Sequence, residues 1–410
     1  MDFHKSHIVL VAAGQPATNP RLLKEALCLA ANGYQITVVF CFSADWADLF
    51  DAQIINDNPS INWILAGGHP KAQKISFFIS RLLNRLFKYS SFFIKAHKKY
   101  SLNRASWALI KASKKLQANL YIGHNLAALP AVAIAAKEKK AIYAFDAEDY
   151  HRGQFPNESK ESKLSAFIED SYIPGAAYLT AASPLIAAKY KEHYPNLNPI
   201  VINNLFSLNN ICTQPLEYRN MEVLKLFWFS QTVGSGRGIE KIIEVMRILK
   251  DIPLQFTILG ECKKDEKKRL LDLADGFESQ IEFLPPVEEK EIFYIASQHH
   301  IGLALEVEGT INRDICLTNK IFTYLLSGLA IVATNTAAQV LFFKTYPDIG
   351  KVFNKDKIEE LETIIRNWYE HPAALNEMKV NSLALAKSKY NWEEEQEILL
   401  NEVNTILLKQ

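Results

Sequence analysis

The sequence predicts an α/β protein made of two domains, each built around a parallel sheet. Its 410 residues exceed what one ordinary hydrophobic core holds, which favours two domains of about 200 residues. A short apolar run, a turn containing glycine, a helical stretch and a second apolar run follow one another over residues 7–42. The same order starts again at residues 224–261 and at 301–334. Repeated strand–helix–strand units of this kind are typical of parallel sheets covered by helices.

The order of these patterns also divides the chain. Apolar runs in the first half predict strands at 7–14, 34–42, 120–125 and 141–146, with helical spacing between them. Ser183 and Pro184 are well suited to open a further helix. Residues 206–222 are polar without apolar periodicity and are the predicted linker. We therefore expect a first domain over 1–205, a second domain over 223–388 and a final helix over 389–410.

The composition is that of an ordinary globular protein. Apolar residues make up 49% of the chain and charged residues 22%. No stretch of eighteen uncharged apolar residues occurs, and the first residues run directly into a strand, so we expect neither a transmembrane helix nor a signal peptide. The five cysteines have no paired spacing, which predicts buried small hydrophobes in a reducing, cytoplasmic compartment rather than disulfides or a metal site.

Positive charge is concentrated in one block. Residues 58–137 contain thirteen lysines and arginines and neither aspartate nor glutamate. Within 71–104 apolar and basic side chains alternate, and Arg81, Arg85 and Lys88 recur at helical spacing, as in a helix lying on an anionic membrane surface. A pair of core helices with solvated lysines explains the aromatic residues equally well. Nucleic acid is a weaker third partner, and we do not expect it, because no recognised motif accompanies the charge.

The stretch 305–336 carries the clearest sign of a ligand site. A polar loop and a helix lie there between two apolar runs, which places the loop at the carboxyl edge of a parallel sheet, where α/β folds bind ligands. The helix begins at Thr318, a good N-cap, followed by Asn319, and Lys320 adds a cation to the unpaired amides of the first turn. These features predict a phosphate site. An ordinary capped helix in an α/β repeat is the alternative.

Other loops at strand ends carry further candidates. In the loop at 234–238, GSGRG, glycines allow close approach to phosphates and Arg237 can hold two oxygens. Gly14 follows the first strand, and Arg21 either meets an anion or is a solvated helix residue. Polar residues also follow two later strands: His124 and Asn125, then Asp146, Glu148 and Asp149. The motif G-x-G-x-x-G is absent from the first turn, which argues against a dinucleotide coenzyme.

Three segments resemble one known family. NKIFTYLLSGLAIVATN at 319–335 resembles the donor-binding helix of retaining glycosyltransferases of the GT-B fold, in the large family four. HNLAALPA at 124–131 and YAFDAED at 143–149 resemble two further segments of that family. The resemblance implies two Rossmann-like domains facing across a cleft, with the C-terminal helix crossing back to the first domain. It also implies transfer of a sugar, with retention, from a nucleotide-diphosphate donor to a glycan or lipid-linked glycan, as in polysaccharide biosynthesis, without a metal or cofactor.

The resemblance also implies roles for individual residues. The catalytic residues would be His124, Arg237 and Lys320. The donor-binding residues would be Gly14, Gln231, Thr232, Gly236, Gly260, Thr318, Asn319 and Thr323. The acceptor-side residues would be Arg21, Asn125, Asp146 and Asp149.

The sequence departs from the family at several positions. Thr323 stands where the family has a glutamate that contacts the ribose, and Ile315 stands where it has a second glutamate. Gln231 or Thr232 occupies the place of an arginine. These departures leave a non-catalytic nucleotide-sugar binding protein as an alternative. A nucleotide-sugar epimerase is the other alternative, and it needs a dedicated set of acid and base carboxylates.

Overall fold

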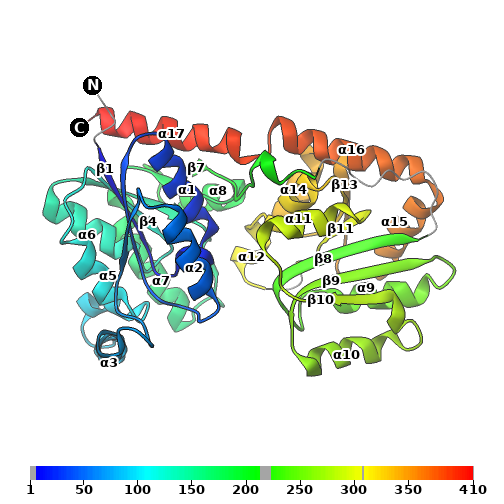
Figure 1. The fold of residues 1–410 in the computed structure, drawn as a ribbon, viewed down its shortest axis with the longest axis horizontal. Helices are drawn as coiled ribbons and strands as arrows, with labels where there is room; N and C mark the ends of the chain where they lie inside the picture. The colour runs from blue at the N-terminus through cyan, green and yellow to red at the C-terminus, as the bar shows by residue number, and fades with distance from the viewer. Residues whose placement is uncertain (1–5, 213–222, 307–308, 410) are drawn as a thin grey trace. The chain divides into compact units, whose positions relative to one another are not determined.

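The computed structural model describes residues 6–212, 223–306 and 309–409 and consists of two compact units (Figure 1). Unit 1 comprises Met1–Asn203, Thr310–Asn312 and Gln396–Gln410, and unit 2 comprises Asn204–Gly309 and Arg313–Glu395. The chain leaves unit 1 just before the predicted linker, of which residues 213–222 lie outside the described ranges. It returns to unit 1 briefly at Thr310–Asn312 and again within the last helix.

Unit 1 is built on a seven-stranded parallel sheet in the order β3-β2-β1-β4-β5-β6-β7. The strands are β1 (His7–Ala12), β2 (Gln35–Phe40), β3 (Asn62–Leu65), β4 (Leu120–His124), β5 (Ile142–Ala147), β6 (Leu179–Ala181) and β7 (Ile200–Val201). β1 pairs with β2 on one side and β4 on the other, so the strand order reverses between β1 and β4. Ligands of open α/β sheets bind at the carboxyl ends of the strands at this switch point.

The helices of unit 1 cover both faces of this sheet (Figure 1). They are α1 (Pro20–Ala31), α2 (Ala47–Asp57), α3 (Lys74–Ser90), α4 (Lys98–Ser101), α5 (Ser106–Ser113), α6 (Leu129–Lys139), α7 (Lys160–Tyr172) and α8 (Pro184–His193). Local chemistry explains where they begin: the Asn19 side chain accepts from the Leu22 amide at α1, and the Ser183 hydroxyl accepts from the Ile186 amide at α8. Buried β-strand residues such as Val9, Val11 and Tyr121 pack on α6 in the core.

Unit 2 has a six-stranded parallel sheet in the order β10-β9-β8-β11-β12-β13. The strands are β8 (Leu224–Val233), β9 (Leu254–Cys262), β10 (Ile281–Leu284), β11 (Ile301–Ala304), β12 (Ala330–Thr334) and β13 (Gly350–Phe353). The helices are α9 (Ile239–Ile248), α10 (Lys264–Ala274), α11 (Glu289–Ser297), α13 (Asn319–Leu326), α14 (Ala337–Thr345), α15 (Ile358–Glu370) and α16 (Pro372–Ser388), while α12 (Ile311–Ile315) is divided between the two units. The switch point lies between β8 and β11. The prediction of two parallel α/β sheets is therefore confirmed.

The last helix, α17 (Trp392–Leu408), belongs to both units. At its start the Ser207 hydroxyl donates to Glu393 at 2.6 Å, within unit 2. Near its end Asn404 accepts a hydrogen bond from the Tyr34 hydroxyl, within unit 1. The expectation that the C-terminal helix crosses back to the first domain is confirmed.

The structure bears on two expectations from composition, the burial of the cysteines and the lack of a membrane-spanning helix. Cys28 and Cys41 are buried as expected, but Cys212, Cys262 and Cys316 are only half-buried, so the expectation of five buried cysteines is wrong for these three. Each of the three lies in a loop or at a strand end, where a small side chain is covered on one side only. Among the described residues, no helix has both the length and the apolar character needed to cross a membrane.

Candidate functional site

The switch point of unit 1 brings polar side chains from three elements together. In the register of the sheet, His124 at the end of β4 lies beside Ala12 of β1 on one side and Asp146 of β5 on the other. Arg21 and Glu25 come from α1, where a spacing of four residues puts them on one face. Glu148 follows β5. We call Arg21, Glu25, His124, Asp146 and Glu148 the His124 cluster.

The His124 cluster is a buried network of ion pairs. The His124 ring is fully buried, with Nε2 2.8 Å from Glu25 and Nδ1 3.2 Å from Asp146 and 3.5 Å from Glu148. Arg21 donates two hydrogen bonds to Asp146, at 2.8 Å from Nε and 2.6 Å from Nη2. Its Nη1 donates to the Ile202 carbonyl at 2.7 Å. Arg21 is therefore not a solvated helix residue, and the anion that it meets belongs to the protein.

The charges of this network reinforce one another. Burial alone lowers the pKa of His124, but the Glu25 charge and the hydrogen bonds to the carboxylates outweigh it and raise the pKa well above its ordinary value. Burial alone raises the pKa of Asp146, but the charge and hydrogen bonds of Arg21, together with His124, lower it below its ordinary range. His124 is therefore a cation and Asp146 an anion at neutral pH.

The same cluster has a geometry that raises the question of a metal. His124, Asp146 and Glu148 each offer a ligand atom, and these atoms lie within 4.8 Å of one another. However, the Asp146 oxygens already accept from Arg21 and from the Thr180 hydroxyl at 2.6 Å, which leaves few lone pairs for a metal. These contacts fit an ion-pair network better than a metal site. The absence of a metal from the function remains a prediction.

The other acceptor-side candidates of unit 1 lie in separate contacts. The Asn125 side chain accepts from the Ala13 amide at 3.4 Å and joins the end of β4 to the loop after β1 that contains Gly14. Asp149 accepts from Gln154 at 2.8 Å and from Asn312 at 2.8 Å. Both residues thus hold loops at the carboxyl edge of the sheet.

In unit 2, α13 follows the loop after β11, so its first turn lies at the carboxyl edge of the sheet. The Lys320 ammonium is 3.1 Å from the Glu306 carboxylate and 5.8 Å from the centre of the Trp228 ring. Thr318 is the N-cap of α13, but its side chain makes no capping hydrogen bond, and its buried Oγ1 has no hydrogen-bond partner among the described residues. A hydroxyl and an ammonium therefore accompany the amides of the first turn.

The inner face of α13 is packed against the sheet. Thr323 is 1% exposed. The neighbouring Tyr324 hydroxyl donates to the Leu303 carbonyl at 3.1 Å, and the Tyr324 ring contacts Phe229 edge-on at a centroid distance of 5.8 Å. Ile315, in the preceding α12, is also buried. The two positions that depart from the family's glutamates are thus both buried.

The loop 234–238 reaches the same edge from β8. Gly236 and Gly238 have φ of +75° and +81°, so the backbone of this loop requires glycine, and Gly238 is the N-cap of α9. Arg237 is half-buried, while Gln231 and Thr232 at the end of β8 are exposed. Gly260, with φ of +145°, allows β9 to approach, because a Cβ there would lie 2.1 Å from the Ser230 carbonyl oxygen.

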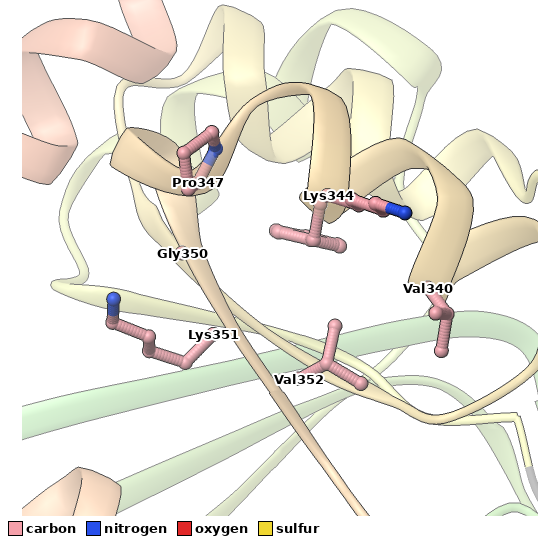
Figure 2. Close-up of a pocket in the computed structure, with 7 residues that line it drawn as sticks. Val340, Lys344, Pro347, Gly350, Lys351 and Val352 are labelled. Atoms are coloured by element: carbon pink, nitrogen blue, oxygen red, sulfur yellow. The ribbon is translucent and has the colours of Figure 1, made fainter.

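A pocket elsewhere in unit 2 is unrelated to these residues. It encloses about 300 Å³ between α14 and β13 and is lined by Val340, Phe343, Lys344, Pro347, Gly350, Lys351 and Val352 (Figure 2). Its two lysines extend in different directions and do not converge on one point (Figure 2). None of the predicted site residues, all of which the structure describes, lines it.

Comparison with known proteins decides the fold. No family model matches the sequence, and no curated protein sequence matches it significantly. Sucrose-phosphate synthase from Thermosynechococcus elongatus superposes with a TM-score of 0.71 at 13% identity, over 99% of this chain and 100% of that one. Anabaena HepE in complex with UDP gives 0.67 at 14% identity, over 98% and 100% of the two chains. WaaG, a glycosyltransferase involved in lipopolysaccharide biosynthesis, gives 0.61 at 13%, over 95% and 98%. The chain has the GT-B fold.

Within this GT-B fold, each sheet brings one set of predicted residues to its switch point. Unit 1 joins Arg21, His124 and Asp146 in one cluster. Unit 2 places the loop of Arg237 and the helix of Lys320 after the adjacent strands β8 and β11. The predicted site residues did not include Glu25, Thr180, Trp228 or Asn312, which also contribute. Only Glu25 had a sequence signal, its spacing of four residues from Arg21.

Proposed function

We propose that the protein is a glycosyltransferase that moves a sugar, with retention, from a nucleotide-diphosphate donor to a glycan or lipid-linked glycan. The observation that carries this proposal is the gathering of cations and amides at the carboxyl ends of β8 and β11, which are neighbours in the unit 2 sheet. The glycine-rich loop with Arg237 follows β8, and the helix α13 with Lys320 follows β11. Cations and main-chain amides stabilise the negative charge that a departing diphosphate acquires in the transition state.

The contacts of Lys320 support this role. Its side chain is 12% exposed, and its ammonium is held by Glu306 beside the Trp228 ring. Because an ammonium has three donors, Lys320 can keep its contact with Glu306 and also donate a hydrogen bond to a phosphate oxygen. We infer that Glu306 fixes the direction of Lys320, and that Arg237 and the amides of the first turn bind the rest of the diphosphate.

Two proteins of the same fold support a nucleotide as the first ligand to test. HepE has been solved in complex with UDP and with UDP-glucose. TarM from S. aureus has been solved, as a mutant, with fondaparinux, α-GlcNAc-glycerol and UDP. We therefore propose uridine nucleotides as the first donor class to test. We propose that His124 and the residues around it form the acceptor side.

The second candidate is a protein that binds the nucleotide sugar without transferring it. The burial of Thr323 and Ile315 favours it, because neither side chain can replace a carboxylate at the ribose or the sugar. An epimerase is less well supported. The carboxylates of the His124 cluster are the nearest to an acid and base set, but they are held in ion pairs with Arg21 and His124.

The experiment is a calorimetric titration of the full chain with UDP and a panel of nucleoside diphosphates and nucleotide sugars. We expect at least one nucleoside diphosphate to bind, and Arg237→Ala to weaken its binding by about 1.5–3 kcal/mol, because a charge-assisted hydrogen bond is lost. This corresponds to a roughly ten- to 150-fold higher Kd.

The matched control is Arg247→Ala, which removes the same charge from an exposed position on α9. The affinity of this variant for the nucleoside diphosphate should equal that of the unchanged protein. If Arg237→Ala binds as tightly as Arg247→Ala, the loop 234–238 does not hold the diphosphate. If no nucleoside diphosphate binds the unchanged protein, the proposed donor class is wrong.

A further inference from the structure

Helix α3 is attached to unit 1 mainly through polar and aromatic contacts along one face. The Ser80 hydroxyl donates to the Gly67 carbonyl at 2.9 Å, and the Asn84 amide donates to the Asn103 carbonyl at 2.8 Å. Phe87 packs on Tyr100 with ring centroids 4.5 Å apart. These residues follow one another at intervals of three or four, so together they mark the inner face of α3, which is drawn end-on in Figure 1.

The opposite face of α3 is apolar and exposed. Its side chains also recur at helical intervals, and three more apolar residues follow the helix. All nine are 45–77% exposed, and we call them the α3 patch: Ile75, Phe78, Ile79, Leu82, Leu86, Tyr89, Phe92, Phe93 and Ile94. The outer face of a surface helix is ordinarily polar, and a contiguous exposed apolar patch marks an interaction site.

The charge carried by α3 and by the residues that follow it is entirely positive. Lys74, Arg81, Arg85 and Lys88 are exposed and recur along one side of the helix next to the apolar face, and Lys95 follows. No acidic residue occurs between 58 and 137 to offset them. A symmetric contact between two copies through this patch would bring like charges together, which disfavours a dimer here. An anionic partner with an apolar interior matches both features.

We propose that the α3 patch docks the protein on the surface of an anionic lipid bilayer. The apolar side chains enter the interfacial region, and the adjacent lysines and arginines contact the phosphate head groups. The helix lies along the surface, with its inner face still attached to unit 1 through Ser80, Asn84 and Phe87. This proposal does not depend on the proposed activity, since it rests on a surface outside both switch points.

The test is co-sedimentation of the full chain with vesicles of phosphatidylcholine alone and of phosphatidylcholine mixed with phosphatidylglycerol. We expect binding to the anionic vesicles, at least tenfold weaker binding to the neutral ones, and release by 1 M salt, at which the Debye length is about 3 Å. Two variants should each lower binding to anionic vesicles at least tenfold. One carries Phe78→Gln and Leu82→Gln, and the other carries Arg81→Glu, Arg85→Glu and Lys88→Glu. Because all five side chains are exposed, their melting curves should match that of the unchanged protein.

Each variant has a matched control in unit 2. Val380→Gln with Tyr294→Gln removes two apolar side chains that are 67% and 63% exposed. Lys263→Glu, Lys264→Glu and Lys268→Glu make the same change in net charge around the first turns of α10. Both controls should bind vesicles like the unchanged protein. Equal binding to neutral and anionic vesicles, binding to neither, or an equal loss in the controls would each overturn the proposal. A dimer that forms without lipid and is lost in the Phe78 and Leu82 variant would assign the patch to a second copy instead.

Discussion

The His124 cluster places opposite charges inside unit 1, beside the ends of β1 and β4. Asp146 is its centre, since it contacts Arg21, His124 and the Thr180 hydroxyl. Removing one partner of a buried ion pair leaves an unpaired charge and typically costs about 3–5 kcal/mol. The cluster thus holds α1, β4 and β5 together and fixes the edge of the sheet that the proposed acceptor would approach.

The raised pKa of His124 predicts a pH dependence of stability. A charged His124 stabilises the folded state fully below its unfolded pKa of about 6.5, and this contribution is lost as pH rises through its higher folded pKa. Urea unfolding followed from pH 6 to pH 9 should therefore show stability falling on the alkaline side. His124→Gln should be less stable at pH 6 and should show a shallower fall. His371→Gln, at an exposed position, should keep the original slope, and an unchanged slope in His124→Gln would contradict the assignment.

The sequence shows which residues lie at strand ends but not what they bind there. Arg21, His124 and Asp146 were all predicted near the carboxyl edge, and the structure places them at the switch point. The sequence could not distinguish an external anion from an internal carboxylate. Arg21 and Asp146 are 125 residues apart, and only the register that puts His124 beside Asp146 brings them together.

The approach of α13 to β11 depends on Gly302. A Cβ at this position would lie 2.3 Å from the Tyr324 ring, closer than non-bonded atoms can approach. Tyr324 also donates to Leu303 and contacts Phe229, so it has little freedom to move. Gly302 therefore sets how closely the helix that carries Lys320 lies on the sheet.

We predict that Gly302→Ala destabilises the protein by about 1–3 kcal/mol, as expected for an overpacked core, and also weakens nucleotide binding by shifting α13. Urea unfolding and calorimetric titration measure the two effects. Gly234→Ala is the control for stability, because a Cβ there would meet no described atom within 4 Å. It should change the free energy of unfolding by less than about 0.5 kcal/mol. Equal stability of the two variants would show that Tyr324 can move aside.

Strong periodicity decided which elements could be predicted. β11, α13 and β12 were predicted from apolar runs separated by a helical pattern, and the structure contains all three. Several other elements were not predicted, among them β3 and α12. β3 has four residues at the edge of its sheet, and α12 has five residues in a polar loop, so neither has enough residues to show a period.

The two halves of the molecule share one arrangement, a parallel sheet with a switch point. Each sheet presents polar side chains at the point where its strand order reverses, and length and repeated patterns were enough to predict two such sheets. The direction of α3 could not be predicted in this way. Its apolar period fits a helix facing inward or outward, and the structure turns that face outward because Ser80 and Asn84 anchor the other one by hydrogen bonds.

The most direct test of the proposed glycosyl transfer is the rate at which nucleoside diphosphate is released from the nucleotide sugar that binds most tightly, with and without glycan and lipid-linked glycan acceptors. We predict release that requires an acceptor and a product that keeps the anomeric configuration of the donor, as read by NMR. Arg237→Ala should lower the rate by about 10²–10³, the range for losing one donor to a developing anion, while Arg247→Ala should not. Tight binding of nucleotide sugars with release at the background rate for every acceptor would contradict transfer and favour a protein that only binds them.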